Sequence, residues 1–318
     1  MIGRTPALAV AADLDAAAAY SKTAYSEATR RAYRADWADW TGWCARAGVP
    51  PLPAPPELVA AYLSSLAATH GRSSLRRRLA AIGQAHLLAG HSWMVSHPAI
   101  RTTLRGILRR HGTPSRQAAA LTTAEIRRLV AVCDGGLTGV RDRAMLLIGF
   151  AGALRRSELV GIDREHITLT HEGLRLLIPR AKTDPEGEGA EIGLPRGKAT
   201  ETCPVRALRH WLEMSDTAYG PVFRKIDKWG TIETGRLCPE AVRQILRRRA
   251  TEAGITVPAH ERLSPHGLRA GFITEAYKEG ARDEAIMGHT RHADLKTMRR
   301  YVRRAKLMEE SPVKLLGL

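Results

Sequence analysis

Residues 264–304 have the sequence SPHGLRAGFITEAYKEGARDEAIMGHTRHADLKTMRRYVRR, which sets polar side chains where an apolar core would not place them. Ser264 can cap a helix that has Pro265 at its first position. His266 and Arg269 then lie three residues apart, on adjacent turns of one helix face. Such a pair is also common on ordinary helix surfaces, so its meaning depends on the rest of the chain.

A tyrosine among arginines follows in the same stretch. Tyr301 lies nine residues after His292 (301 − 292 = 9) and twelve after His289 (301 − 289 = 12). A tyrosine in this setting can be a buried ring with a polar rim. It can also be a phenol whose ionisation the neighbouring positive charges favour.

Two basic segments precede this stretch. GFAGALRRSELVGI (149–162) closes a mostly apolar run, 141–160, that predicts one long helix. In it Glu158 can simply pair with Arg155, three residues earlier. Lys182 lies at the tip between two predicted strands, where a lone lysine is usually solvated. Neither segment indicates chemistry when taken alone.

The second half of the chain is predicted to be mainly α-helical with one small antiparallel sheet. Leu121, Thr122 and Glu125 are spaced as in a capped helix start, so a new domain begins near residue 118. The other expected elements are short strands at 166–169, 174–178 and 191–194 and a basic helix at 240–250.

The first 110 residues are predicted to form a separate helical domain. Four aromatic residues within 29–44 are three or four positions apart and favour a helix-bundle core over base stacking. They are Tyr33, Trp37, Trp40 and Trp43. Further helices are expected at 57–68 and from Ser73 or Ser74 onward. The polar run HGTPSRQAA has no apolar period, which predicts a linker over 112–119.

The charge of the chain favours a polyanionic partner. Lys and Arg number 49 against 32 Asp and Glu, which gives a net charge of +17. Binding to DNA would release counterions from each phosphate that such residues neutralise. A basic protein kept soluble by its charge, or one that docks on anionic lipid, is the alternative. The arginines expected to contact DNA are Arg30, Arg72, Arg76, Arg77, Arg78, Arg243 and Arg247.

Composition argues against membrane and metal chemistry. No window supplies the ~20 apolar residues that span a bilayer, and the Ala-rich N-terminus is short for a secretory signal. Four scattered cysteines with no C-x-x-C pair indicate reduced thiols and no zinc site. We therefore expect a cytoplasmic protein without a metal or other cofactor.

In order and spacing, these segments resemble the catalytic domain of the tyrosine recombinases, the family of phage integrases, Xer-type resolvases and Cre-like enzymes. The positions that match the family's catalytic residues are Arg155, Lys182, His266, Arg269, His292 and Tyr301, with Glu158 as the supporting acid. The N-terminal half is similar to the family's core-binding domain in SEATRRAY (26–33) and SSLRRRLAAI (73–82), and CPVRAL (203–208) is similar to a segment of phage- and plasmid-type members.

This chain departs from the family pattern at two places. It has two adjacent arginines where the family has one, and Arg155 is preferred to Arg156 because it lies three residues before Glu158. It also offers two histidines before the tyrosine. His292 stands at the family's distance of nine residues and is preferred to His289, which remains the alternative.

The resemblance implies a two-domain, C-shaped DNA clamp. Residues 1–111 would be the helical core-binding domain, 112–119 the linker, and 120–318 the catalytic domain with a tail helix. The partner would be double-stranded DNA with a specific recombination site, bound by a homotetramer in the nucleoid. The tail leucines Leu315, Leu316 and Leu318 would pack on a neighbouring protomer, or else dock on their own domain.

The same resemblance implies a reaction without ATP or metal. Tyr301 would attack a phosphodiester to give a 3′-phosphotyrosine, with Arg155 and Arg269 clamping the phosphate and His266 as acid or base partner. Lys182 would protonate the leaving 5′-oxygen, His292 would hydrogen-bond the phosphate, and Glu158 would orient a neighbour. The alternatives are a type IB topoisomerase and a DNA-binding protein without activity, and Tyr277 is the next tyrosine to consider.

Overall fold

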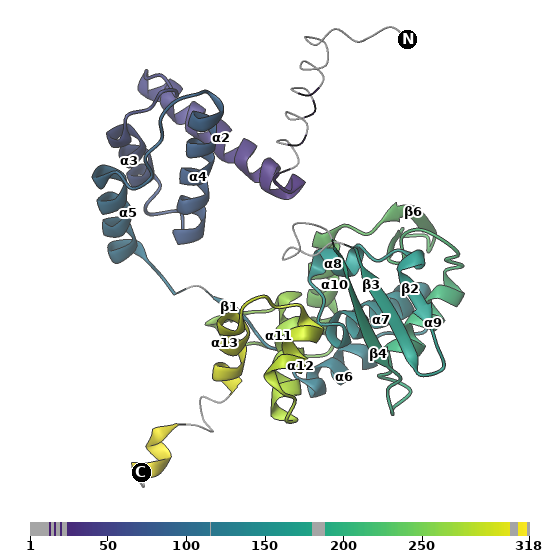
Figure 1. Ribbon diagram of the computed structural model, residues 1–318. Coiled ribbons are helices and arrows are strands. Elements are labelled where there is room, and N and C mark those ends of the chain that lie inside the picture. The colour runs from purple at the N-terminus through teal and green to yellow at the C-terminus, as the bar shows by residue number, and fades with distance from the viewer. Residues whose placement is uncertain are drawn as a thin grey trace, which may run out of the picture. The chain divides into compact units, whose positions relative to one another are not determined.

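The structure is a computed structural model of the 318-residue chain and describes residues 24–114, 116–179, 188–305 and 311–316, together with positions 13, 16 and 20. The chain divides into two compact units, Met1–Ser115 and Arg116–Leu318 (Figure 1). No helix in the described residues is long and apolar enough to cross a bilayer.

Helices alone make up the regular structure of the first unit between residues 24 and 114. They are α2 (Glu27–Ala47), α3 (Pro56–Ser65), α4 (Arg72–Leu88) and α5 (Pro98–His111). The predicted aromatic face of α2 is confirmed in part: Trp40 is fully buried with its ring 5.0 Å from that of Tyr62 on α3, and Trp37 and Trp43 pack against the same core. Tyr33 instead lines a groove of the unit. α2 packs against α4 and α3 against α5.

The second unit combines helices with three small sheets in its described part. Its helices are α6 (Thr123–Ala131), α7 (Leu137–Ala151), α8 (Arg156–Val160), α9 (Pro204–Met214), α10 (Pro239–Glu252), α11 (His266–Lys278), α12 (Asp283–Thr290) and α13 (Leu295–Ala305), with 3₁₀ turns η1 (Arg164–His166) and η2 (Pro312–Leu316). The predicted antiparallel sheet is confirmed as β2 (Ile167–Leu169), β3 (Gly173–Ile178) and β4 (Ala190–Pro195), in that order.

The expectation of a single sheet was wrong. β1 (Gln117–Ala118) pairs in parallel with β7 (Glu261–Arg262), and β5 (Arg224–Ile226) pairs with β6 (Ile232–Arg236). These pairs are two to five residues long, too short for a period-2 pattern to stand out in the sequence.

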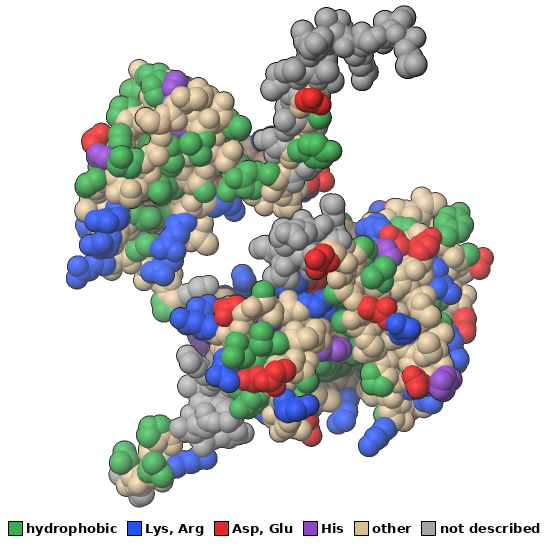
Figure 2. Space-filling model, in the orientation of Figure 1, with side chains coloured by type: hydrophobic (Ala, Val, Ile, Leu, Met, Phe, Trp, Pro, Cys, Tyr) green, Lys and Arg blue, Asp and Glu red, His purple; other side chains and the backbone are tan. Residues whose placement is uncertain are grey.

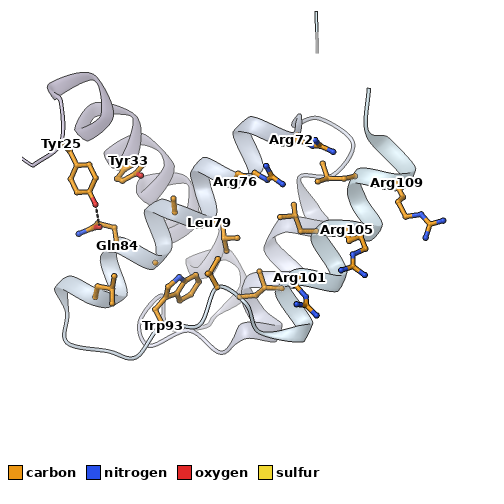
Figure 3. Close-up of a pocket in the computed structure, with 17 residues that line it drawn as sticks. Tyr25, Tyr33, Arg72, Arg76, Leu79, Gln84, Trp93, Arg101, Arg105 and Arg109 are labelled. Atoms are coloured by element: carbon orange, nitrogen blue, oxygen red, sulfur yellow. Dashed lines mark hydrogen bonds between the residues drawn. The ribbon is translucent and has the colours of Figure 1, made fainter. Parts of the chain in front are cut away.

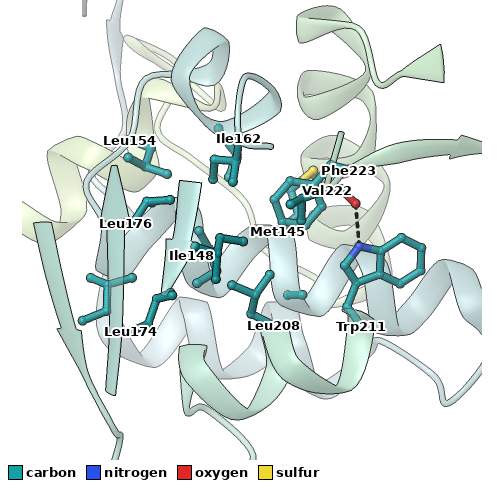
Figure 4. Packing of buried hydrophobic residues seen from close by; sticks show 14 of the residues in the cluster. Met145, Ile148, Leu154, Ile162, Leu174, Leu176, Leu208, Trp211, Val222 and Phe223 are labelled. Atoms are coloured by element: carbon teal, nitrogen blue, oxygen red, sulfur yellow. Dashed lines mark hydrogen bonds between the residues drawn. The ribbon is translucent and has the colours of Figure 1, made fainter. Parts of the chain in front are cut away.

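One large apolar cluster of the second unit lies between the three-stranded sheet, α7 and α9 (Figure 4). Leu174 and Leu176 of β3 face Ile148 of α7 in this cluster. Trp211 of α9 is fully buried and satisfies its indole by donating to the carbonyl of Val222 at 2.8 Å. The sheet and α7 therefore form one packed body on which the adjoining loops are mounted.

The predicted linker over 112–119 extends too far at its C-terminal end. Ala118 and Ala119 are buried, because the β1–β7 pairing ties this segment to the residues just before α11. The helix lies so close to it that a Cβ on Gly271 would come within 1.9 Å of the Leu121 carbonyl oxygen. Only glycine allows this approach, which holds α11 against the start of the unit.

The predicted long helix over 141–160 is in fact two helices. α7 ends at Ala151, and Ala153 adopts a left-handed conformation with φ of 46° before α8 begins at Arg156. A run of apolar residues indicates burial, but it does not show where the backbone breaks within it.

Ser264 was expected to cap α11, and this was wrong. Pro265 is the N-cap residue and has no side-chain cap. The Ser264 hydroxyl is buried without a hydrogen-bond partner among the described residues, while its carbonyl accepts from the Gly267 amide at 2.8 Å. The capping box expected at Thr122 and Glu125 is confirmed at the start of α6.

Asp142 of α7 is a fully buried carboxylate that binds three arginines. We predict that Asp142→Ala lowers the free energy of unfolding by about 3–5 kcal/mol, because it leaves the buried guanidiniums of Arg141 and Arg249 without this counterion. Urea unfolding of the full chain measures the change. Glu213→Ala, which removes only an exposed pair with Arg209, is the control and should cost less than about 1 kcal/mol. Equal losses in the two variants would contradict the assignment.

Candidate active site and a basic groove

Five of the six residues matched to the family's catalytic set lie in the described part of the second unit, and the structure brings them together. They come from four elements: Arg155 is the N-cap residue of α8, His266 and Arg269 begin α11, His292 follows α12, and Tyr301 is on α13. Lys182, the sixth, lies outside the described residues.

Tyr301 and His266 are in direct contact. The tyrosine hydroxyl oxygen and Nε2 of His266 are 2.5 Å apart. Burial raises the pKa of Tyr301, and the charges of Arg269 and Arg155 oppose that rise. Burial and the same two arginines lower the pKa of His266. A protonated phenol therefore faces a neutral imidazole that is able to accept its proton.

The two histidines before Tyr301 have different surroundings. The ring of His292 lies 6.3 Å from the Tyr301 ring and 3.4 Å from the Arg269 guanidinium. His289 instead binds the Ala151 carbonyl at 2.7 Å and stacks on Phe272 at 4.6 Å. The geometry thus favours His292 as the second histidine of the site.

Thr290 determines the tautomer of His292. The threonine hydroxyl lies 2.7 Å from the Ile286 carbonyl oxygen and 2.7 Å from Nδ1 of His292. Because its one proton goes to the carbonyl, the hydroxyl accepts from a protonated Nδ1. Burial and the charges of Arg269 and Arg155 lower the pKa of His292 to about 4, so the ring is neutral with Nε2 available.

Arg269 is buried, with 1% of the residue exposed, and is held by the break between α7 and α8. Its Nη1 donates to the carbonyl of Ala153 at 2.7 Å. Burial and the charge of Arg155 lower its pKa to about 9, and it stays protonated at neutral pH.

Arg155 is held by Glu158 rather than by a backbone carbonyl. Its Nη1 donates to Oε1 of Glu158 at 2.5 Å, and its backbone amide donates to Oε2 at 2.9 Å. Burial would raise the pKa of Glu158, but these bonds and the charge of Arg291 lower it, so the carboxylate is ionised. The two guanidiniums of the site are thereby held in place before any substrate arrives.

Sequence reasoning assigned no role to Arg291. Its Nη2 donates to Oε2 of Glu158 at 2.9 Å, and its side chain is 8% exposed. The residue closes α12 in a left-handed conformation with φ of 56°. No local pattern could have revealed a partner 133 positions away in the chain.

The site consists of cations, imidazoles and a phenol. Among the described residues, no group of three or more His, Cys, Asp or Glu side chains is placed to hold a metal ion. The arrangement is suited to binding an oxyanion between Arg155 and Arg269 while a hydroxyl loses its proton to His266.

A basic groove of about 790 Å³ lies on the first unit between α4 and α5 (Figure 3). Its floor is apolar, with Leu79, Trp93 and Leu104. Its rim carries Arg72 and Arg76 of α4 and Arg101, Arg105 and Arg109 of α5. Positions four apart on one helix lie on one face, so each helix presents a row of charge, and basic side chains gather along this edge of the unit (Figure 2).

The arginines expected to contact DNA differ in their availability. Arg77 is bound by Asp36 at 2.7 Å, and Arg243 pairs with Glu240. The side chain of Arg78 is 12% exposed and binds Asp39, so it is largely engaged within the unit. Arg30 and Arg247 are exposed, as are Arg72 and Arg76. Sequence reasoning missed the α5 row, whose signal was the four-residue spacing of Arg101, Arg105 and Arg109.

Comparisons with known proteins point to one family. The model of the phage integrase family matches residues 119–308. An integrase/recombinase XerD homolog of Selenomonas ruminantium is 33% identical over 89% of this chain and 83% of its own length. Tyrosine recombinase XerC of Serratia marcescens is 27% identical over 77% of this chain and 74% of its own length.

Solved structures share the fold. A lambda integrase dimer bound to a COC′ core site superposes with a TM-score of 0.59 and 14% identity, covering 95% of this chain and 81% of that one. XerH site-specific recombinase in a post-cleavage complex with difH gives a TM-score of 0.57 at 17% identity, covering 83% and 71%.

We predict that His292 titrates near pH 4 in the free protein and that Arg155→Gln raises the pKa of both His292 and His266. Removing the nearby positive charge makes protonation of each ring easier. NMR pH titration of the histidine ring protons measures both effects. Arg209→Gln, a surface change on α9, should leave the two titrations unaltered, and rings that titrate alike in wild type and Arg155→Gln would contradict this electrostatic picture.

Proposed function

This chain belongs to the phage integrase family, and we propose that it is a site-specific tyrosine recombinase that cleaves and rejoins DNA through Tyr301. The contact of Tyr301 with His266 beside two guanidiniums is the observation that carries the assignment of the nucleophile. A tyrosine with a pKa of about 10 is a poor nucleophile at neutral pH unless a base or a positive field assists it.

Cleavage begins when a phosphodiester enters between Arg155 and Arg269. Their forked donors match its non-bridging oxygens and stabilise the charge that develops in the pentacoordinate transition state. The Tyr301 oxygen forms a bond to phosphorus as its proton passes to Nε2 of His266, and the bond to the 5′-oxygen breaks. His292 presents Nε2 to the same phosphate, whose negative charge raises the pKa of the ring and lets it donate.

Lys182 completes the reaction by protonating the leaving 5′-oxygen, a role that rests on the family resemblance alone. The products are a 3′-phosphotyrosine and a free 5′-hydroxyl. Because the new linkage keeps the energy of the phosphodiester, a hydroxyl from a second strand can displace Tyr301 and reseal the DNA without ATP. The two guanidiniums supply the charge stabilisation that metal ions supply in other phosphoryl-transfer enzymes.

The basic groove of the first unit is the proposed core-binding surface. Its two rows of arginines suit contacts with successive phosphates, and these position a protein on duplex DNA without reading sequence. We assign the helical unit to core binding and the second unit to catalysis, closing around duplex DNA as a C-shaped clamp. Such a protein works in the cytoplasm, at the nucleoid.

We extend the proposal to a homotetramer on DNA that exchanges C-terminal tails. Leu315 is 88% exposed and Leu316 is 67% exposed, more than apolar side chains at a chain end usually remain without a partner. The third tail leucine, Leu318, lies outside the described residues. A type IB topoisomerase shares the chemistry but acts as a monomer, and the helical first unit and the tail favour the recombinase.

We predict that wild-type protein forms a covalent adduct with a nicked suicide DNA and that Tyr301→Phe forms none. Loss of the hydroxyl removes the nucleophile while keeping the partly buried ring. Adducts trapped from a library of random duplexes, separated by denaturing electrophoresis and sequenced at their flanks, reveal both the activity and the site.

Tyr277→Phe is the matched control and should keep the activity. Adduct formation by Tyr301→Phe would move the nucleophile to another residue. Equal trapping on all DNA sequences, with relaxation of any supercoiled plasmid, would indicate the topoisomerase, and no adduct at all would indicate a binding protein.

We predict that replacing Arg101, Arg105 and Arg109 together by Gln weakens binding to all duplexes alike. Each lost phosphate contact should lower the slope of log K against log salt concentration by about 0.9. Fluorescence anisotropy between about 50 and 200 mM salt measures it. Arg46→Gln on α2 is the surface control, and an unchanged slope in the triple variant would exclude this groove from the DNA contact.

A further inference from the structure

Arg291 joins two parts of the candidate site that are far apart in the chain. Its Nη1 donates to the carbonyl of His289 at the end of α12, at 2.9 Å. Its Nη2 donates to Oε2 of Glu158 on α8, also at 2.9 Å. The same Oε2 accepts the backbone amide of Arg155. One guanidinium therefore ties the end of α12 to the residue that holds Arg155.

The pairing also changes the charge of the site. The side chain of Glu158 is 2% exposed and pairs with Arg155, so by itself it would cancel one of the two positive charges that bind the phosphate. Arg155, Arg269 and Arg291 with Glu158 leave a net charge of two (3 − 1 = 2). Without Arg291 the same cluster would have a net charge of only +1.

The backbone conformation of Arg291 has a structural role separate from that of its side chain. Its left-handed conformation ends α12 and directs the next residue, His292, toward Tyr301. A side chain is strained at such a position, whereas glycine adopts it freely. The arginine is thus present despite the backbone, and its side-chain contacts are what offset the strain.

We propose that Arg291 is a positioning residue for DNA cleavage, which orients Glu158 for Arg155 and supplies the countercharge that keeps the site doubly positive. The inference rests on the proposed recombinase function and goes beyond it, because it assigns a role to a residue outside the set matched to the family.

The test measures the rate of Tyr301–DNA adduct formation, across pH, on the site identified by adduct sequencing. Arg291→Gly removes the guanidinium but permits the same backbone, so His292 keeps its place. We expect this variant to react about tenfold to a hundredfold more slowly. Losses of this size are typical when a residue that orients a metal ligand through a hydrogen bond is removed. Arg291→Lys, which keeps the charge but loses the fork, should recover part of the rate.

The pH profile separates positioning from a merely structural effect. The charged groups that act on Glu158 are Arg155 and Arg291, with Arg269 beyond them. Loss of Arg291 raises the pKa of Glu158, so the carboxylate takes up its proton at a higher pH as the solution is acidified. The acid limb of the rate profile should therefore move to higher pH in Arg291→Gly and largely return in Arg291→Lys.

A double-variant cycle tests whether Arg291 acts through Glu158. In a Glu158→Gln background, Arg291→Gly should slow the reaction little further, because the partner it orients is already altered. Arg299→Ala, which removes a surface pair with Asp283 on the same segment, is the control and should keep the wild-type rate and profile.

A wild-type rate and acid limb in Arg291→Gly would overturn the inference, and so would losses that simply multiply in the double variant. Melting temperatures identify any variant that fails to fold. If Arg291→Gly does not fold, the pH profile of Arg291→Lys is compared with that of the wild type instead. If the wild-type chain itself forms no adduct, the proposed function fails, an outcome distinct from a wild-type enzyme whose Arg291 variants are unimpaired.

Discussion

The guanidinium of Arg269 is taken almost wholly out of water and donates to the carbonyl of Ala153, and the rest of the site is arranged around this contact. A buried cation needs a polar partner, because its desolvation is otherwise far too costly. The left-handed turn at Ala153 supplies that partner, and Arg155, two residues later, is the N-cap residue of α8. One backbone break therefore places both guanidiniums.

Around this pair, His266, His292 and Tyr301 stay uncharged in the free protein. Burial and the arginine charges lower the pKa of His266 and of His292, while burial raises the pKa of Tyr301. In the free protein the phenol keeps its proton and His266 is able to take it. In the proposed reaction, a bound phosphate would offset the positive field, so that activation of Tyr301 would be coupled to the arrival of DNA.

The two units hold their basic side chains in place in different ways. The first packs its aromatic face inward and leaves two rows of arginine on a groove with an apolar floor. The second uses ion pairs of the buried Asp142 to join α7 to α10. Stable cores of this kind hold long basic side chains in place, which is what phosphate contacts and phosphoryl transfer both require.

The sequence by itself determined the residue types of the site, their order, the capped start of α6 and the three strands of the main sheet. These follow from local spacing, which the chain carries wherever it folds. The nine-residue spacing already favoured His292 over His289, and the tertiary structure added their surroundings: His292 lies beside Arg269 and Tyr301, whereas His289 binds the Ala151 carbonyl. Tertiary structure alone decided that Arg78 pairs with Asp39, that 141–160 breaks at Ala153, and that Arg291 reaches Glu158. Each of these depends on burial or on a partner distant in the chain, and neither leaves a periodic signal in the sequence.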